Sequence, residues 1–199
     1  MRILCQGDSI TDANRMYDAN DLGQGYVKFI QQDLKDVEVI NKGISGNRTL
    51  ELMDRWQKDT LDVNPDILTI LIGINEVWHH FRFQKYITKE TYYETYQKLI
   101  QKAKLNNPSI KILIIEPFVF KCGFYEAPWM PFLNDLQVLA RRISNEYNLP
   151  FVPMQSILDG YLDTYQPEAI LGDGVHPTEL GHQLMAKHIL TYLKEMMEE

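Results

Sequence analysis

The chain has few of the residues that mark several large classes of protein. Two cysteines in 199 residues, Cys5 and Cys122, are too few for a disulfide framework or a cysteine zinc site. Acidic residues outnumber basic ones by 27 to 20, and the net charge of −7 argues against nucleic acid or an anionic membrane surface as a partner. The longest apolar run, residues 67–74, is far too short to cross a bilayer.

Leader and linker patterns are also absent. The first apolar run begins at Ile3, which leaves no room ahead of it for a secretion signal. No stretch rich in proline, glycine and serine divides the chain, and 45% hydrophobic residues suffice for one full core. We therefore expect a single cytoplasmic domain over residues 1–199, with reduced cysteines and no contact with a membrane.

Short apolar runs alternate with helical patterns along the chain. The expected strands cover residues 3–5, 37–40, 67–72, 110–115 and 151–154. The expected helices cover residues 25–34, 50–63, 91–105, 131–147 and 179–197. This order predicts an α/β protein with a parallel sheet and helices on both faces. Three connections that follow strands are unusually long and should form the binding surface: residues 11–25, 74–90 and 117–130.

Three residues are suited to nucleophilic catalysis. Ser9 follows the first predicted strand in Gly-Asp-Ser-Ile-Thr, and Asp173 and His176 lie three residues apart in Asp-Gly-Val-His-Pro. Serine attacks esters when a histidine, oriented by a carboxylate, removes its proton. The three residues therefore predict a serine hydrolase. Taken separately, Gly-Asp-Ser is also typical of a turn that caps a helix, and the aspartate and histidine of a capped surface turn.

Two further strand ends carry donors for an oxyanion hole. The segment Asn-Lys-Gly-Ile-Ser-Gly-Asn (41–47) contains glycines, including Gly46, that let a backbone N–H approach a ligand closely. The segment Gly-Ile-Asn-Glu (73–76) offers the side-chain amide of Asn75. Loss of one such donor raises a reaction barrier by about 3 to 4 kcal/mol.

The four blocks together resemble the SGNH hydrolases, also called GDSL esterases, in the family's own order. The resemblance implies that Ser9, Asp173 and His176 are catalytic, and that Ser9, Gly46 and Asn75 form the oxyanion hole. It implies a three-layer α/β/α sandwich with a five-stranded parallel sheet in flavodoxin-like order. No metal or other cofactor is expected. Within the family, the blocks look most like bacterial acetylxylan and carbohydrate acetylesterases.

Two positions depart from the family pattern. Glu76 follows Asn75 where the family usually has aspartate, so we expect the amide of Asn75 to be held less firmly. Gly172 precedes Asp173 where acetylesterase-like members tend to have a bulky aromatic residue, which would widen the acyl pocket. Asp8, Trp78 and Val175 are further candidate substrate-binding residues.

Other residues are weaker candidates for chemistry. Ser45 lacks the Gly-x-Ser-x-Gly setting of an α/β-hydrolase nucleophile. His79 and His80 are adjacent, cannot face one metal, and are expected in a solvated loop. His182 and His188 in the last helix lack the spacing of paired metal ligands.

The leading hypothesis is a serine esterase that removes acetyl or other short acyl groups from a small molecule or an oligosaccharide. Most aromatic residues in the connections at 74–90 and 117–130 are expected in the core or in a homo-oligomer contact, and a few could line the cleft and support a sugar ring or an acyl chain. The alternatives are a lysophospholipase or acyl-thioesterase with the same triad, and a non-catalytic carbohydrate-binding relative. A metal-dependent phosphoesterase is the least favoured.

Overall fold

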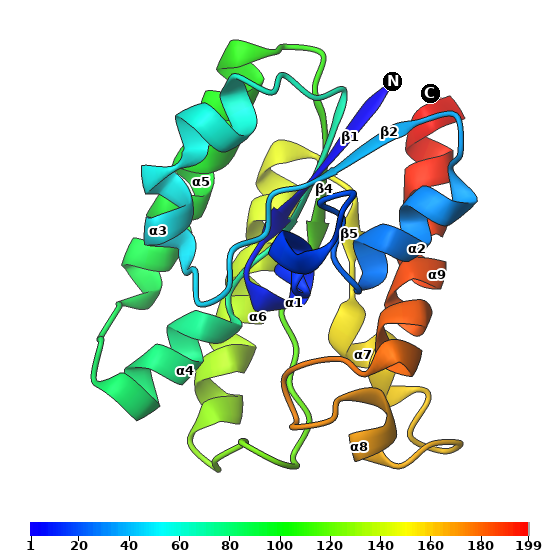
Figure 1. Cartoon of the computed structure of the whole chain (residues 1–199). Coiled ribbons are helices and arrows are strands. Elements are labelled where there is room, and N and C mark those ends of the chain that lie inside the picture. Colours follow the sequence, from blue (N-terminus) through cyan, green and yellow to red (C-terminus); the bar gives the residue numbers. More distant parts are fainter. Residues whose placement is uncertain (199) are drawn as a thin grey trace.

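Five parallel strands form the centre of the computed structural model, which describes residues 1–198 (Figure 1). The strands are β1 (Arg2–Gly7), β2 (Glu38–Asn41), β3 (Ile67–Leu71), β4 (Lys111–Ile115) and β5 (Phe151–Val152). Their order is β2-β1-β3-β4-β5, so the winding direction reverses between β1 and β3. The predicted α/β class and the flavodoxin-like order are confirmed. In open α/β sheets, the loops that leave the two strands at this reversal form the binding crevice.

Helices cover both faces of the sheet. On one face α2 (Tyr26–Asp33) packs against α9 (Glu179–Glu198). On the other, α5 (Lys89–Asn106) packs against α3 (Thr49–Asp54) and α6 (Trp129–Tyr147) (Figure 1). The remaining helical segments are α1 (Ser9–Asp12), η1 (Arg15–Tyr17), η2 (Gln57–Leu61), α4 (Ile74–Phe83), α7 (Met154–Asp159) and α8 (Pro167–Ile170).

The core lies between the sheet and its helices. Every side chain of β3 is buried, as expected for a central parallel strand covered on both faces. Trp56 and Trp129 are the largest fully buried side chains. Cys5 is buried, Cys122 is half-buried, and neither forms a disulfide. Among residues 1–198, no helix combines the length and apolar character needed to span a bilayer.

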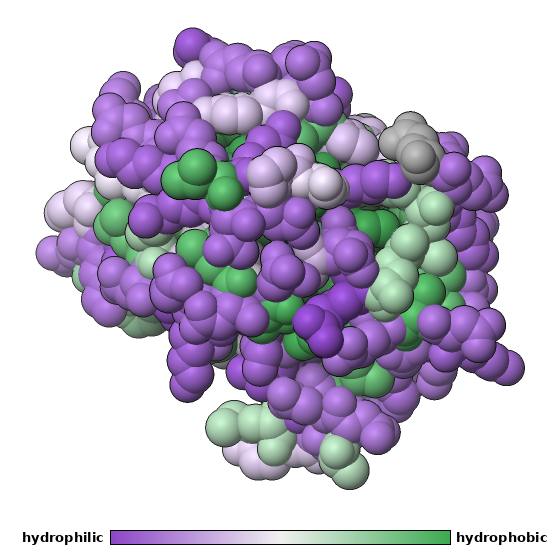
Figure 2. All heavy atoms as spheres, turned by 90° about the horizontal axis from the view of Figure 1, so that it is seen from above, coloured by the Kyte–Doolittle hydropathy of each residue, from purple (hydrophilic) through white to green (hydrophobic). Residues whose placement is uncertain are grey.

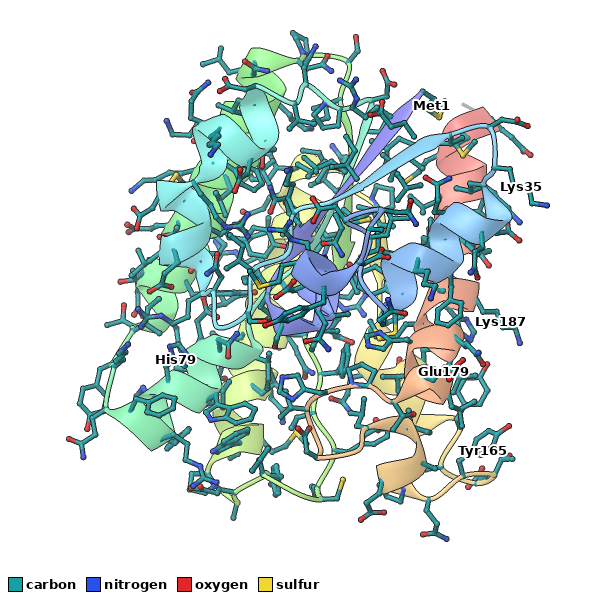
Figure 3. The ribbon with its side chains drawn as sticks, viewed as in Figure 1. Met1, Lys35, His79, Tyr165, Glu179 and Lys187 are labelled. Carbon is teal, nitrogen blue, oxygen red and sulfur yellow. The ribbon has the colours of Figure 1, made fainter. Side chains whose placement is uncertain are left out.

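The connection expected at residues 74–90 is mostly helix, so this prediction was wrong. Four consecutive residues, Ile74–Val77, are buried, and α4 begins directly after Gly73, which adopts a φ of 143°. A Cβ at Gly73 would lie 2.9 Å from the Pro117 ring, so glycine lets β3 turn into α4 without a longer loop. His79 and His80 are half-buried on α4 rather than in a solvated loop. Figure 3 shows His79 on this helix.

The helix expected at residues 50–63 is divided. It begins one residue earlier as α3, breaks at Arg55, and continues as the wider η2, where the N–H of Asp62 bonds to the carbonyl of Gln57. Four short helices, α1, η1, α7 and α8, were not predicted, because three to six residues are too few to show a hydrophobic period.

The two ends of the sheet differ in character. Figure 2 shows the face at the amino ends of the strands, where hydrophilic residues predominate and apolar ones form small separate groups. The residues with predicted chemistry follow the carboxyl ends instead: Ser9 follows β1 and Asn75 follows β3. Because Gly7 is paired with Leu71, these two strand ends lie side by side.

Candidate active site

The three predicted catalytic residues form one hydrogen-bonded relay. Ser9 Oγ lies 2.9 Å from His176 Nε2, and His176 Nδ1 lies 2.7 Å from Asp173 Oδ2. An ionised carboxylate can only accept, so Nδ1 carries the proton and Nε2 is left to accept from the serine hydroxyl. The relay is therefore arranged to take a proton from Ser9.

The serine is held by the first turn after β1. Asp8 Oδ1 accepts a hydrogen bond of 3.0 Å from the N–H of Ile10, which caps α1 and fixes Ser9 as its first residue. Asp8 is 1% exposed, and its other oxygen has no partner among the described residues. Burial, with a smaller contribution from the negative charge of Glu76, raises the pKa of Asp8 to about 7 despite the Ile10 bond.

The aspartate is oriented by its own turn. Asp173 Oδ1 accepts from the backbone N–H groups of Val175, at 2.9 Å, and His176, at 2.7 Å. Its other oxygen is thereby left to face the imidazole. Burial opposes ionisation of Asp173, but hydrogen bonds from the His176 N–H, the His176 ring and the Val175 N–H outweigh it and lower the pKa.

The loop after β4 packs closely on this turn. The N–H of Phe124 donates to the carbonyl of Asp173 at 2.7 Å, and that of Phe120 to the carbonyl of Gly174 at 2.8 Å. Gly123 has a φ of +57°, and a Cβ there would lie 2.2 Å from the Asp173 carbonyl oxygen. The approach of the two segments therefore requires glycine at position 123.

The three predicted oxyanion donors each have an unused N–H hydrogen. In residues 1–198, the backbone N–H groups of Ser9 and Gly46 have no hydrogen-bond partner. Gly46 has a φ of +81°, and a Cβ there would meet nothing within 4 Å, so this glycine borders open space. One Nδ2 hydrogen of Asn75 is used on the carbonyl of Asn47 at 3.1 Å, which orients the amide and leaves the second hydrogen to donate.

Glu76 braces the same loop through Thr49, and its effect on Asn75 stays a prediction. Its Oε1 accepts from the N–H of Thr49 at 2.6 Å and from the Thr49 hydroxyl at 2.9 Å. Asn75 thus bonds to Asn47 and Glu76 to Thr49, and these two partners flank Arg48 in the sequence. Glu76 is fully buried, and this burial raises its pKa to about 7 although the bonds from Thr49 favour the charged form.

Arg55 is a second brace. Its guanidinium donates to the Asn47 side chain at 2.6 Å, to the carbonyl of Lys42 at 2.7 Å and to the carbonyl of Gly7 at 3.0 Å. One side chain therefore ties the end of β1 to the glycine loop that follows β2. Sequence reasoning missed both Thr49 and Arg55, because neither belongs to a recognised block and their partners come from other elements.

A cavity of about 780 Å³ begins at Ser9 and His176 and extends between α2 and α9. Its wall is mainly polar and comprises Ser9, Ile10, Ala13, Asn14, Gln24, Lys28, Phe29, Gln32, Ser45, His176, Pro177, Glu179 and His182. Glu179 stands at the start of α9, on the opposite side of the molecule from His79 (Figure 3). The volume is within the range of small-molecule sites.

An aromatic group lies on the other side of the imidazole. The Trp78 ring centroid is 5.7 Å from that of His176, 5.2 Å from Phe124 and 5.4 Å from Trp129. Of the three candidate substrate-binding residues, Trp78 is thus beside the relay. Asp8 and Val175 are each 1% exposed and do not line the cavity, so we assign them to positioning their catalytic neighbours.

Ser45 and the remaining histidines lie outside the relay. The Ser45 hydroxyl donates to Asp12 at 2.6 Å, and His188 Nε2 lies 2.9 Å from the Tyr161 hydroxyl. Within the described part of the chain, no three histidine, cysteine, aspartate or glutamate side chains are grouped as metal ligands would be.

Comparisons with known proteins agree with this geometry. The sequence model of the GDSL-like Lipase/Acylhydrolase family matches residues 5–184. An acetylxylan esterase of Geobacillus stearothermophilus is 32% identical over 95% of this chain and 92% of its own. Its crystal structure superposes with a TM-score of 0.84, covering 96% of this chain and 92% of that one. The structure of a Parabacteroides merdae protein described as a GDSL-like lipase superposes with a TM-score of 0.91 at 36% identity, covering 96% of this chain and 95% of that one.

The match includes all four sequence blocks and at least part of every strand of the sheet. The family model begins within β1 and ends within α9, so it covers both Ser9 and His176. The chain therefore belongs to the GDSL-like lipase/acylhydrolase family and is a carboxylic ester hydrolase of the SGNH type.

Proposed function

We propose that the protein is a serine esterase that removes acetyl or other short acyl groups from a carbohydrate. The observation that carries the proposal is the 2.9 Å contact between Ser9 Oγ and His176 Nε2 at the mouth of a wide polar cavity. The acetylxylan esterase activity named for the Geobacillus relative supports the same substrate class. Two structures of that relative described as catalytic mutants replace a serine and a histidine by alanine.

In the proposed acylation, His176 Nε2 takes the Ser9 hydroxyl proton as Oγ bonds to the ester carbonyl carbon. The resulting oxyanion accepts hydrogen bonds from the N–H groups of Ser9 and Gly46 and from Asn75 Nδ2. Collapse of the intermediate breaks the bond to the leaving oxygen, which receives the proton from Nε2. The alcohol departs and Ser9 keeps the acyl group as an ester.

Deacylation repeats these steps with water as the nucleophile. His176 Nε2 takes a proton from the water, whose oxygen attacks the acyl carbon in the same oxyanion hole. The proton then passes to Ser9 Oγ, and the carboxylic acid leaves. Asp173 stays ionised and stabilises the imidazolium in each step, which agrees with its lowered pKa. No proposed step uses a cofactor.

Two assays test the substrate class. Release of acetate from acetylated xylo-oligosaccharides tests the carbohydrate, and the rates on p-nitrophenyl esters from acetate to octanoate test the acyl group. We expect acetate release and a maximum at the shortest esters. A maximum at octanoate would instead favour a lysophospholipase or acyl-thioesterase, the alternative supported by the aromatic group at Trp78, Phe124 and Trp129.

Two finer expectations remain proposals. Ten large hydrophobic side chains after Met1 are more than one third exposed, among them Met16, Tyr17 and Tyr86, and we propose that some are covered in a homo-oligomer. Light scattering on a gel-filtration column tests this. We also propose a cytoplasmic location, supported by two unpaired cysteines, which fractionation of the source cells tests.

A further inference from the structure

One buried histidine on the cavity wall has no part in the relay. His182, on α9, is 8% exposed and lines the cavity that begins at Ser9 and His176. Its Nδ1 accepts a hydrogen bond of 3.2 Å from the N–H of Tyr26, the first residue of α2. The cap residue of that helix is Gly25, which has no side chain to offer, so the imidazole of His182 caps α2 from a distant part of the chain.

The ring is fixed in place and in one tautomer. A Cβ at Gly25 would lie 2.9 Å from His182 Cε1, so the ring packs directly against this backbone. Because Nδ1 accepts a hydrogen bond, the proton of the neutral ring is on Nε2. Burial, and then the charge of His176, lowers the pKa of His182 to about 4, which keeps the ring neutral near pH 7.

The Nε2–H group is left without a partner. No side chain or carbonyl within residues 1–198 accepts from it, although most buried polar groups in proteins are paired. The Nε2 atom is not fully enclosed by protein, so it retains access to solvent. Nδ1 and Cε1 face α2, so Nε2 belongs to the edge of the ring that forms the cavity wall.

His182 and His176 line the same cavity, and this placement indicates which part of a substrate lies next to His182. His176 returns its proton to the leaving oxygen, so the departing alcohol must lie against His176. The cavity runs from there to His182 between α2 and α9. Gln24 and Lys28, joined by a 2.7 Å hydrogen bond, and Glu179 line the same space. An alcohol in this cavity therefore meets donors and acceptors rather than an apolar groove.

We propose that His182 Nε2–H donates a hydrogen bond to a hydroxyl or ring oxygen of the sugar that leaves as the alcohol. His182 is then a specificity-determining residue that selects polyol esters over esters of apolar alcohols. The proposal rests on the proposed esterase function and adds the group that recognises the alcohol.

The decisive variant is His182→Asn. The Oδ1 atom of asparagine replaces Nδ1 as the acceptor for the Tyr26 N–H, and the outward donor at Nε2 is lost. We compare kcat/KM on acetylated xylo-oligosaccharide with kcat/KM on p-nitrophenyl acetate, whose alcohol has no sugar hydroxyl. The ratio is expected to fall about tenfold, mainly through a higher KM for the sugar ester. His188→Asn, on the same helix and outside the cavity, should leave the ratio unchanged.

A second measurement needs no change at position 182. In Ser9→Ala protein, which cannot turn over, long-range 1H–15N spectra report the tautomer of each histidine. His182 should show a proton on Nε2 at pH 6 to 8, and its Nε2 resonance should shift as unlabelled xylo-oligosaccharide is added. A proton on Nδ1, or no shift at saturating sugar, would overturn the proposal even if His182→Asn does not fold.

Failure of this proposal can be distinguished from failure of the esterase function. If wild-type protein releases acetate from the sugar ester and His182→Asn keeps the wild-type ratio, the role of His182 is wrong and the function stands. If wild-type protein cleaves p-nitrophenyl acetate but no acetylated sugar, the carbohydrate assignment itself is wrong, and the role of His182 with it.

Discussion

The two sides of Ser9 are built differently. On the proposed oxyanion side, Asn75 and Glu76 bond to Asn47 and Thr49, which flank the Gly46 loop, through hydrogen bonds of 2.6 to 3.1 Å. Arg55 ties the same loop to the end of β1. On the alcohol side, the wall of the cavity includes polar side chains that are half-buried or exposed, among them Lys28 and Gln32 of α2 and Glu179 of α9.

This difference means that one set of residues serves the chemical reaction and another set serves recognition of the substrate. Stabilisation of an oxyanion needs donors fixed within a fraction of an ångström, because their energy depends on preorganisation. Recognition of an alcohol needs a surface that can change without disturbing those donors. Substitutions on the oxyanion side should therefore lower the rate on every substrate alike, whereas substitutions at His182 should lower the rate only on sugar esters. Four predictions test this separation.

The largest effect should follow Ser9→Ala. It removes the proposed nucleophile, and kcat should fall by at least about 10³-fold on every ester. The side chain is half-buried and bonded only to His176, so the melting temperature should stay within about 2 °C of wild type. A fluorophosphonate should label wild-type protein and not the variant. Activity that survives the substitution would remove Ser9 from the mechanism.

Asn75→Ala should come next. Loss of one oxyanion donor is expected to lower kcat by about 10²- to 10³-fold with little change in KM. The loss should be equal for p-nitrophenyl acetate and for an acetylated sugar, measured by steady-state kinetics on both. A variant that lost activity on only one of them would show that Asn75 binds substrate and that the two sides of Ser9 are not separate.

Two glycines near Asp173 provide a matched pair. Gly123→Ala forces a Cβ to 2.2 Å from the Asp173 carbonyl at a positive φ, and kcat/KM should fall about tenfold or more. Gly172→Ala adds a methyl group that contacts only Thr178 Cγ2, at 3.5 Å, and should change kcat/KM less than twofold. Equal effects in the two variants, with both folded by circular dichroism, would show that the loop at Gly123 does not position Asp173.

The smallest effect concerns stability and pH. The pKa of Glu76 in the folded protein, about 7, lies above its ordinary value of 4.5, so the folded state binds more protons between those pH values. The free energy of unfolding therefore falls as pH rises from about 4.5 to 7, on the order of 1 to 3 kcal/mol for this group.

Glu76→Gln removes that titration and keeps an oxygen for Thr49 to donate to. The difference in melting temperature, variant minus wild type, should be more positive at pH 8 than at pH 5. Thermal denaturation of both proteins across this range measures the difference, in which titrating groups that do not interact with Glu76 cancel. A constant difference would mean that Glu76 stays ionised in the folded protein and that the brace includes a buried charge.

Sequence reasoning was most successful where the signal is local. The strand at residues 67–72 is a run of aliphatic residues, and the relay was predicted from short blocks that follow strands. It failed for α4, because Trp, His and Phe in that segment are as typical of a binding loop as of an amphipathic helix. It also missed the contact of Glu76 with Thr49, since a block contains no information about a residue 27 positions away.

His182 shows a different limit of sequence reasoning. Its spacing argued against a paired metal site, but the partner that fixes its tautomer, the Tyr26 N–H, is 156 residues away and could not be predicted. A backbone donor leaves no pattern in the sequence. Only the packing of α9 on α2 places the imidazole over the start of that helix.

The sequence separation of the relay residues bears on when activity can first appear during synthesis of the chain. Ser9 and His176 are separated by 167 residues, and α9, which follows His176, packs against α2 near the other end of the chain. During synthesis, β1 leaves the ribosome long before the turn that contains Asp173, so a growing chain holds a serine without its base. We therefore expect hydrolysis to begin only once the turn that contains Asp173 has emerged and packed against the end of β1, so that ester cleavage can report this step of folding.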